Sequence, residues 1–394
     1  MNHRIVPRVR ELRYSLIRDM TQRAAAYDDA ILLSIGEPDF DTPEPICRQA
    51  MADVLQGHTH YSHAQGIPEL REALAVRILD QTGLDVHSER IVVTHGGVGG
   101  IVAALRTLVD EGDEVLVPEP HYPDYRAHIA FAGGILRPVI TRFEEGFIPL
   151  AQRIEAAITP KTRVLLLNSP NNPTGAMIPG SVLDELAEVV RKYDLLVISD
   201  EVYDEMVFRG EFQSIVTRPG MDERTVVVKS FSKTFAMTGW RIGYSYGPAW
   251  IMEHMRKVVN YSTLCANTMG QRAAIAALNA DPSLFRAMRD EFSRRSALVC
   301  ERLNTMPYVR VLPPSGTFYV FADIRAITAD SFRFALALLE SEHVVVVPGF
   351  AFGASGEGCI RLACTVSGAR LDEAMDRLGR FLKEYGGRRR HGEG

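Results

Sequence analysis

Short apolar runs alternate with amphipathic stretches through the first two thirds of the chain. The runs are rich in Val, Ile and Leu and have almost no polar interruption, which is typical of strands buried on both faces of a sheet. They lie at Ile91–Thr94, Glu114–Val117, Ile135–Ile140, Val164–Leu167, Leu195–Ile198, Thr225–Val228 and Arg241–Tyr246. Between them, stretches such as Ser181–Tyr193 carry their apolar residues on one helical face.

This alternation predicts an α/β fold with a doubly wound, mostly parallel sheet of seven strands. The last strand, Arg241–Tyr246, follows the previous one after a short connection. Because a parallel pair needs a longer crossover, we expect this strand to be antiparallel.

The pattern changes near Pro282, where a long charged helix is predicted over Ser283–Thr305. Short strand patterns and two further helices follow it. The strands are expected at Val309–Leu312, Gly316–Phe321, Val344–Val347 and Cys359–Ala363, and the helices at Phe332–Ser341 and Ala369–Tyr385. This mixture predicts a second, smaller α+β domain.

Polar clusters follow three of the buried strands. Asn168–Gly175, Ser199–Tyr203 and Ser230–Phe235 each begin where a strand is predicted to end. In open α/β sheets, ligands bind at the carboxyl ends of the strands, so these clusters are expected to meet at one site.

Lys233 is the most informative residue of these clusters. Its ammonium group leaves a buried strand and enters a tight polar turn, where loss of water and nearby cations lower the pKa and make the amine usable for a Schiff base. Ser230, Ser232 and Arg241 would hold a phosphate nearby. The alternative is that Lys233 lies on a solvated loop, as most lysines do.

Three other positions carry candidate chemistry. Asp200 ends an apolar strand, where a buried carboxylate needs a polar or charged partner. The alternative is that Asp200 caps the N-terminus of a helix. The glycine-rich segment His95–Gly100 precedes a predicted helix and suits an anion, but it is also compatible with a dinucleotide fold. Arg361 lies within the apolar stretch Cys359–Ala363, where its planar fork suits a carboxylate.

Composition narrows the class of protein. With 394 residues and 46% hydrophobic content, the chain can bury a large core. A net charge of −5 gives no electrostatic reason to expect nucleic acid or an anionic membrane as a partner, and the apolar runs are too short to span a bilayer. The five cysteines are an odd number without a Cys-x-x-Cys pair, so we expect no disulfide framework, no metal site and a cytoplasmic location.

Together these motifs resemble the pyridoxal phosphate (PLP)-dependent aminotransferases of fold type I, class I/II, which include aspartate and aromatic aminotransferases. The resemblance runs from about Ser34 to Thr365 and includes Ile35–Phe40, Asn168–Gly175, Ser199–Tyr203 and Gly239–Gly243. It implies pyridoxal 5′-phosphate as cofactor and a homodimer with shared active sites. It also implies a large PLP-binding domain over residues 48–285 and a small domain made of residues 1–47 and 286–394.

The resemblance implies a role for each site residue. Lys233 holds PLP covalently and moves a proton, and Asp200 pairs with the pyridinium nitrogen. Tyr203 and Asn172 contact the ring oxygen, while Tyr122 stacks on the ring unless it is a core tyrosine. Gly97, Val98, Ser230, Ser232 and Arg241 form the phosphate site, and Tyr61 reaches the phosphate of the neighbouring subunit. The substrate carboxylate is bound by Gly36, Asn172 and Arg361.

The implied reaction moves an amino group from an L-amino acid to a 2-oxo acid by a ping-pong mechanism through pyridoxamine phosphate. A PLP-dependent lyase or decarboxylase with the same cofactor shell is the alternative. A PLP-sensing transcription regulator is disfavoured because about 30 residues before Ser34 are too few for its extra domain. Val98 stands where some dicarboxylate-specific relatives carry a lysine, so a neutral, aromatic or basic amino donor is at least as plausible as aspartate.

Overall fold

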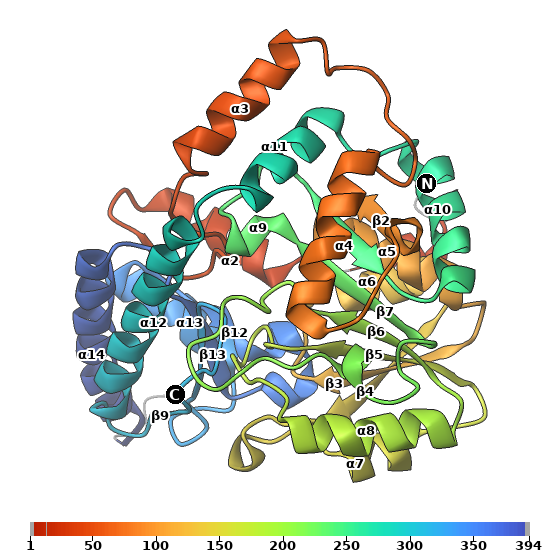
Figure 1. The fold of residues 1–394 in the computed structure, drawn as a ribbon. Coiled ribbons are helices and arrows are strands. Elements are labelled where there is room, and N and C mark those ends of the chain that lie inside the picture. Colours follow the sequence, from red (N-terminus) through yellow and green to blue (C-terminus); the bar gives the residue numbers. More distant parts are fainter. Residues whose placement is uncertain (1–3, 13, 391–394) are drawn as a thin grey trace.

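Seven strands form the large sheet at the centre of the molecule (Figure 1). The structure is a computed structural model that describes residues 4–12 and 14–390. The strand order is β2-β8-β7-β6-β5-β3-β4. Their bounds are β2 Ile91–Thr94, β3 Glu114–Glu119, β4 Ile135–Ile140, β5 Thr162–Asn168, β6 Leu196–Asp200, β7 Thr225–Ser230 and β8 Gly243–Tyr246.

The predicted α/β fold is confirmed, including the direction of the last strand. β8 is antiparallel to both of its neighbours, and the other pairs in the large sheet are parallel. The predicted start of this strand was wrong, because β8 begins at Gly243 instead of Arg241. Arg241 has φ 56°, a left-handed conformation that a strand cannot contain.

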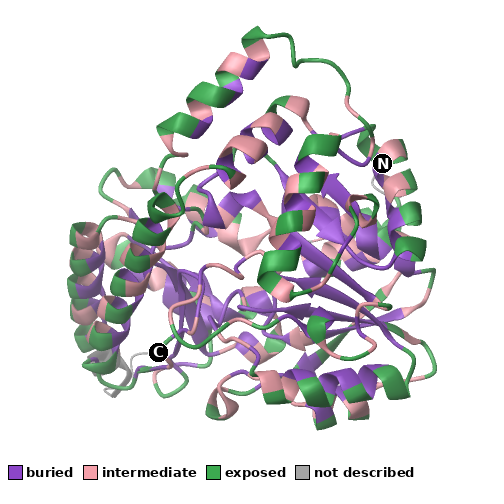
Figure 2. Cartoon of the chain, in the orientation of Figure 1, coloured by how far each residue is buried: buried purple, intermediate pink, exposed green. Residues whose placement is uncertain are grey.

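Helices cover both faces of the large sheet, so its strands are buried while the outer helix faces are exposed (Figure 2). In β7, Val226 and Val228 pack with one helical layer and Val227 with the other, as the period-two geometry of a strand requires. The covering helices are α4 Pro68–Thr82, α5 Gly96–Leu108, α6 Tyr125–Phe131, α7 Ala151–Ala157, α8 Gly180–Lys192, α10 Ala249–Thr263 and α11 Thr268–Leu278.

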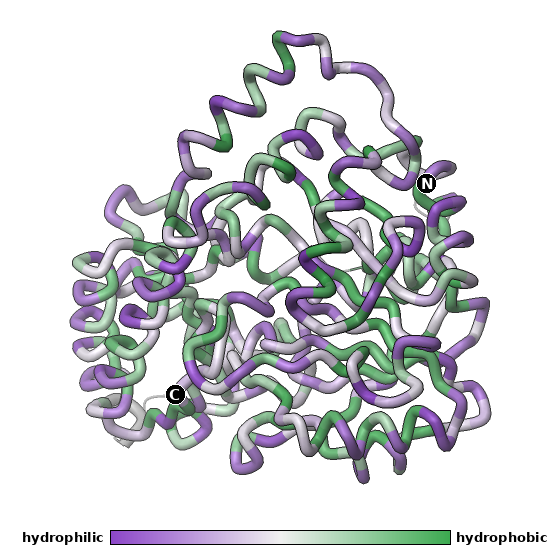
Figure 3. The backbone as a smooth tube through the Cα atoms, in the orientation of Figure 1, coloured by the Kyte–Doolittle hydropathy of each residue, from purple (hydrophilic) through white to green (hydrophobic). Residues whose placement is uncertain are grey.

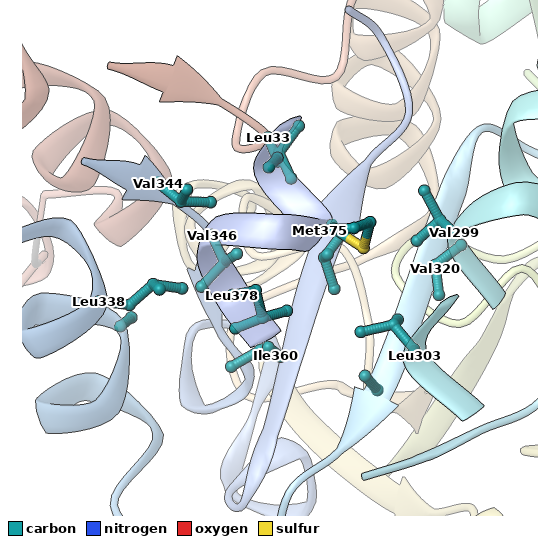
Figure 4. Packing of buried hydrophobic residues seen from close by; sticks show 14 of the residues in the cluster. Leu33, Val299, Leu303, Val320, Leu338, Val344, Val346, Ile360, Met375 and Leu378 are labelled. Carbon is teal, nitrogen blue, oxygen red and sulfur yellow. The ribbon is translucent and has the colours of Figure 1, made fainter. Parts of the chain in front are cut away.

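A four-stranded antiparallel sheet, the small sheet, lies beside the large one. Its order is β12-β13-β10-β9, with bounds Val347–Pro348, Cys359–Ala363, Tyr319–Asp323 and Arg310–Val311. It packs against α12 Ser283–Asn304, α13 Ser331–Glu342 and α14 Gly368–Arg390 around a core that includes Val320, Leu338 and Met375 (Figure 4). The predicted strand Val344–Val347 is divided in two, because Val344–Val345 forms β11 and pairs elsewhere.

The N-terminal segment joins these layers. After the short helices α1 Pro7–Arg10 and α2 Leu16–Arg23, strand β1 Ile31–Leu32 pairs in parallel with β11. Met20 and Leu33 pack in the core of the small sheet, whereas Ile46 of α3 Glu44–Leu55 packs with helices of the large sheet. The segment between Leu33 and Glu44 therefore crosses from one sheet to the other, and the domain division at residues 47/48 and 285/286 stays a prediction.

Apolar residues concentrate in the interior strands, and polar residues on the outer helices (Figure 3). Within the described residues, no helix combines the length and the hydropathy needed to cross a membrane. Each of the five cysteines is free in this structure.

Candidate active site

A cavity of about 470 Å³ opens at the carboxyl edge of the large sheet, a volume in the usual range for small-molecule sites. The loops after β5, β6 and β7 meet there. The residues predicted from sequence that line this cavity are Gly36, Gly97, Val98, Tyr122, Asn172, Asp200, Tyr203, Ser230, Ser232, Lys233, Arg241 and Arg361. Tyr61 is the predicted site residue that lies outside the cavity, and its side chain is 85% exposed.

Lys233 lies in α9 Phe231–Thr234, a single helical turn directly after β7. The Ser230 hydroxyl caps this turn by accepting a hydrogen bond from the Ser232 N–H at 3.1 Å. The Lys233 Nζ donates to the Gly36 carbonyl at 2.6 Å. Burial lowers the pKa of Lys233 to about 8, with Glu37 opposing this change and Arg241 and Arg361 adding to it. About a tenth of the amine is therefore neutral at pH 7, far more than for an ordinary lysine, and the neutral form is the one that acts as a nucleophile.

Asp200 ends β6 and is buried at the floor of the cavity. Its Oδ2 accepts a hydrogen bond from the Tyr125 hydroxyl, and its Oδ1 accepts one from the Val202 N–H at 3.3 Å. Burial raises the pKa of Asp200 to about 6, against the effect of these two donors. The residues after Asp200 form turns, so the helix N-cap alternative is wrong.

Besides Tyr125, three tyrosines line the cavity. The Tyr203 and Tyr319 hydroxyls lie 3.0 Å apart and share a hydrogen bond, and burial raises the pKa of Tyr203 above its usual value. The Tyr122 hydroxyl donates to Asp124 Oδ2 at 2.7 Å. Because Tyr122 is only partly buried and faces the cavity, its ring is available to a bound molecule.

One end of the cavity suits an anion such as phosphate. The first turn of α5 lies there, and the Arg241 side chain lies so close that a Cβ added at Gly96 would be 2.7 Å from its Nη2. A Cβ at Gly97 would be 2.7 Å from Val202 Cγ1, so this position has room only for glycine. The first N–H groups of a helix lack partners within it, and they attract anions together with the arginine.

Arg361 lies in the middle of β13 at the other end of the cavity and is 1% exposed. Its Nη1 donates to Asn172 Oδ1 at 3.0 Å and its Nη2 to the Ser34 carbonyl at 2.6 Å. Both partners are uncharged, and its Nε is buried without a hydrogen-bond partner in the described part of the chain. A buried guanidinium without an acid is a strong site for a carboxylate.

Sequence reasoning missed several residues of the site. Tyr125 is the first residue of α6, three positions after Tyr122, which lies in the preceding loop, and no pattern in the sequence indicated its contact with Asp200. Asn168 at the end of β5 donates to the Asp200 carbonyl at 3.0 Å and accepts from the Asn172 N–H at 2.8 Å. Tyr319 comes from the small sheet, and its apolar strand pattern gave no indication of a polar role.

Known proteins are similar to this chain over nearly its whole length. The family model described as "Aminotransferase class I and II" matches residues 28–378. An aromatic-amino-acid aminotransferase of Thermococcus litoralis is 41% identical, covering 94% of this chain and 96% of its own. An arginine–pyruvate transaminase of Pseudomonas aeruginosa is 40% identical, covering 93% and 97%. The structure of an aspartate aminotransferase from Thermus thermophilus with maleate has a TM-score of 0.91 at 38% identity, covering 95% and 99%.

Proposed function

Because this chain belongs to the aminotransferase class I and II family, we propose that it uses pyridoxal 5′-phosphate to move an amino group from an L-amino acid to a 2-oxo acid. The observation that carries the proposal is one cavity that joins three groups. They are Lys233, a partly buried lysine with a lowered pKa, Asp200, a buried carboxylate, and Arg361, an arginine without an acidic partner.

The cavity fits this cofactor group by group. Asp200 would hold the ring nitrogen, Tyr203 and Asn172 the ring oxygen, and Tyr122 the ring face. The first turn of α5 at Gly97 and Val98 would hold the phosphate, which Ser230, Ser232 and Arg241 would also contact. When bound, PLP supplies an aldehyde that condenses with amines and a ring that accepts electrons.

Lys233 would act as covalent anchor and as general base. Its amine lies at the Gly36 carbonyl, between the large sheet and the N-terminal segment that crosses to the small sheet. A base with a pKa of about 8 is suited to taking a proton from the substrate Cα near neutral pH. A side chain at Gly36 would overlap the Tyr319 hydroxyl, so the close approach of this segment depends on glycine.

Replacing Arg361 by leucine should raise the KM for the amino acid about 100-fold, because truncating one partner of a buried charge pair costs roughly 2–5 kcal/mol. PLP should remain bound, since the residues assigned to it lie elsewhere in the cavity. Steady-state kinetics and a PLP titration measure the two effects. Arg361→Lys is the matched control, which keeps the charge but not the planar fork. An unchanged KM would show that another group holds the carboxylate.

A homodimer is part of the proposal. Tyr61 is exposed and lies outside the cavity of its own chain, as a residue that reaches the phosphate of a neighbouring subunit would. Light scattering should give twice the chain mass of 43.8 kDa, and a fully active monomer would contradict the shared site.

Initial rates measured with varied amino acid and 2-oxo acid test the ping-pong order. One substrate must leave as product before the other binds, so double-reciprocal plots should be parallel. Intersecting lines would contradict this order. Release of ammonia or carbon dioxide without any 2-oxo acid would indicate a lyase or a decarboxylase instead.

A further inference from the structure

The loop after β6 presents its side chains in two directions. Asp200 and Tyr203 face the cavity, whereas Glu201 and Asp204 contact a lysine that does not line it, Lys229 of β7. The residues on either side of Lys229 in β7 show from which face of the sheet its side chain projects. A Cβ at Gly97 of α5 would lie 3.9 Å from Val228 and 3.5 Å from Ser230, so those two side chains face α5. Lys229, between them, projects from the opposite face of the sheet.

Lys229 is 4% exposed, and its ammonium lies among two carboxylates. Nζ is 2.6 Å from Asp204 Oδ2 and 3.5 Å from Glu201 Oε2, and it also donates to Gln81 Oε1 at 3.4 Å. The Glu201 Oε1 accepts hydrogen bonds from the Ser199 and Ser214 hydroxyls. The remaining groups around the ammonium are Tyr244, Tyr246 and the ring of Phe212.

We propose that Lys229 is a positioning residue, which holds Asp200 and Tyr203 in place for the cofactor by neutralising Glu201 and Asp204 behind them. The inference rests on the proposed function, because it concerns the groups that would contact the PLP ring. The Glu201 N–H also donates to the Val228 carbonyl at 2.9 Å, so the loop is tied to β7 by backbone and by side chain.

The charges explain why a lysine is needed here. Without Lys229, the buried Glu201 would have no cation in contact with it, and Asp204 would keep only the more distant charge of Arg77. An undercompensated buried charge is strongly destabilising. The loop would then rearrange to bring Glu201 or Asp204 to water, and Asp200 and Tyr203 would move with it. Glu201 also raises the pKa of the adjacent Asp200, so its own neutralisation favours the ionised Asp200 that a pyridinium partner requires.

Lys229→Met tests the inference with two readouts that do not depend on turnover. The affinity for PLP should fall about tenfold, because the aligned contacts to the ring are weakened. The pH midpoint of the visible absorption of bound PLP should rise by about 0.5–1 unit, because a displaced Tyr203 no longer stabilises the negative ring oxygen. Lys229→Arg should restore both values, since it keeps the buried positive charge.

A charge-balanced double variant separates positioning from general damage. Glu201→Gln combined with Lys229→Met removes one charge of each sign, so it should recover part of the lost affinity. Lys257→Met, which removes an exposed lysine paired with Glu253 on α10, is the matched control and should change neither readout. If Lys229→Met alone does not fold, the PLP affinity and the pH midpoint of the double variant and of Lys229→Arg are compared with those of wild type.

Two results would overturn the inference in different ways. Wild-type protein that fails to bind PLP would overturn the proposed function and this inference with it. Wild-type protein that binds PLP, together with a folded Lys229→Met or double variant that has the same affinity and the same pH midpoint, would overturn only the role of Lys229.

Discussion

Replacing Lys233 by alanine should lower turnover at least about 10⁴-fold, because under the proposed function this one side chain is both the covalent anchor and the general base. The amine lies in the cavity with its pKa lowered to about 8, and the cavity lining includes no other lysine. The visible absorption that PLP gains when it is joined to a lysine should also disappear. Absorption spectra and steady-state rates measure the two losses.

A small primary amine added to the Lys233→Ala protein should recover part of the rate, because it can occupy the space of the lost side chain and accept the proton. Lys257→Ala, at an exposed position, is the control and should behave as wild type. Retention of both the absorption band and turnover in Lys233→Ala would remove the basis of the catalytic assignment.

Asp200→Asn should lower turnover about 10³-fold while the protein still folds. A neutral amide of the same shape cannot keep the ring nitrogen of PLP protonated, so the ring accepts electrons less well. The loss should appear in kcat with little change in the KM for the amino acid, because Arg361 is the group proposed to hold that substrate. Steady-state kinetics with PLP in excess separates the two parameters.

The same variant should be more stable than wild type in the PLP-free state at pH 7. Burial raises the pKa of Asp200 from 3.8 to about 6 in the folded protein. The folded state therefore binds this proton more tightly than the unfolded state, and the stabilisation present below pH 4 is lost as the pH rises through about 6. A shift of this size corresponds to about 3 kcal/mol.

Asp200→Asn lacks this titration, so its free energy of unfolding should not fall between pH 4 and pH 7 as that of wild type does. Urea denaturation of PLP-free protein at the two pH values measures the difference. An Asp200→Asn protein that shows the wild-type pH dependence would mean that Asp200 does not carry the raised pKa.

Much of the fold could be predicted from the sequence because most strands of the large sheet are buried apolar runs, and even the exposed edge strand Ile135–Ile140 is rich in β-branched residues. Ile91–Thr94, Ile135–Ile140 and Cys359–Ala363 have the bounds that the apolar runs predicted. The convergence of the cavity residues followed from the rule that parallel strands end at one edge of the sheet. The prediction placed Arg241 in a strand because its neighbours are apolar, and its left-handed backbone conformation was not visible in the sequence.

Other features depend on contacts that no local pattern records. The hydrogen bond from Tyr125 to Asp200 joins α6 to β6, and the approach of Tyr319 to Tyr203 joins the two sheets. The strand pattern Val344–Val347 gave no sign that its halves pair with different partners. Lys229 follows the predicted strand Thr225–Val228, and nothing in the sequence indicated its contacts with Glu201 and Asp204.

A single-turnover reaction tests the central claim most directly. PLP-loaded protein is mixed with a panel of neutral, aromatic, basic and acidic amino acids, with no 2-oxo acid present. The account predicts one equivalent of 2-oxo acid and one equivalent of pyridoxamine phosphate per site, after which the reaction stops. Continuous release of ammonia or carbon dioxide, with PLP restored after each turnover, would contradict it.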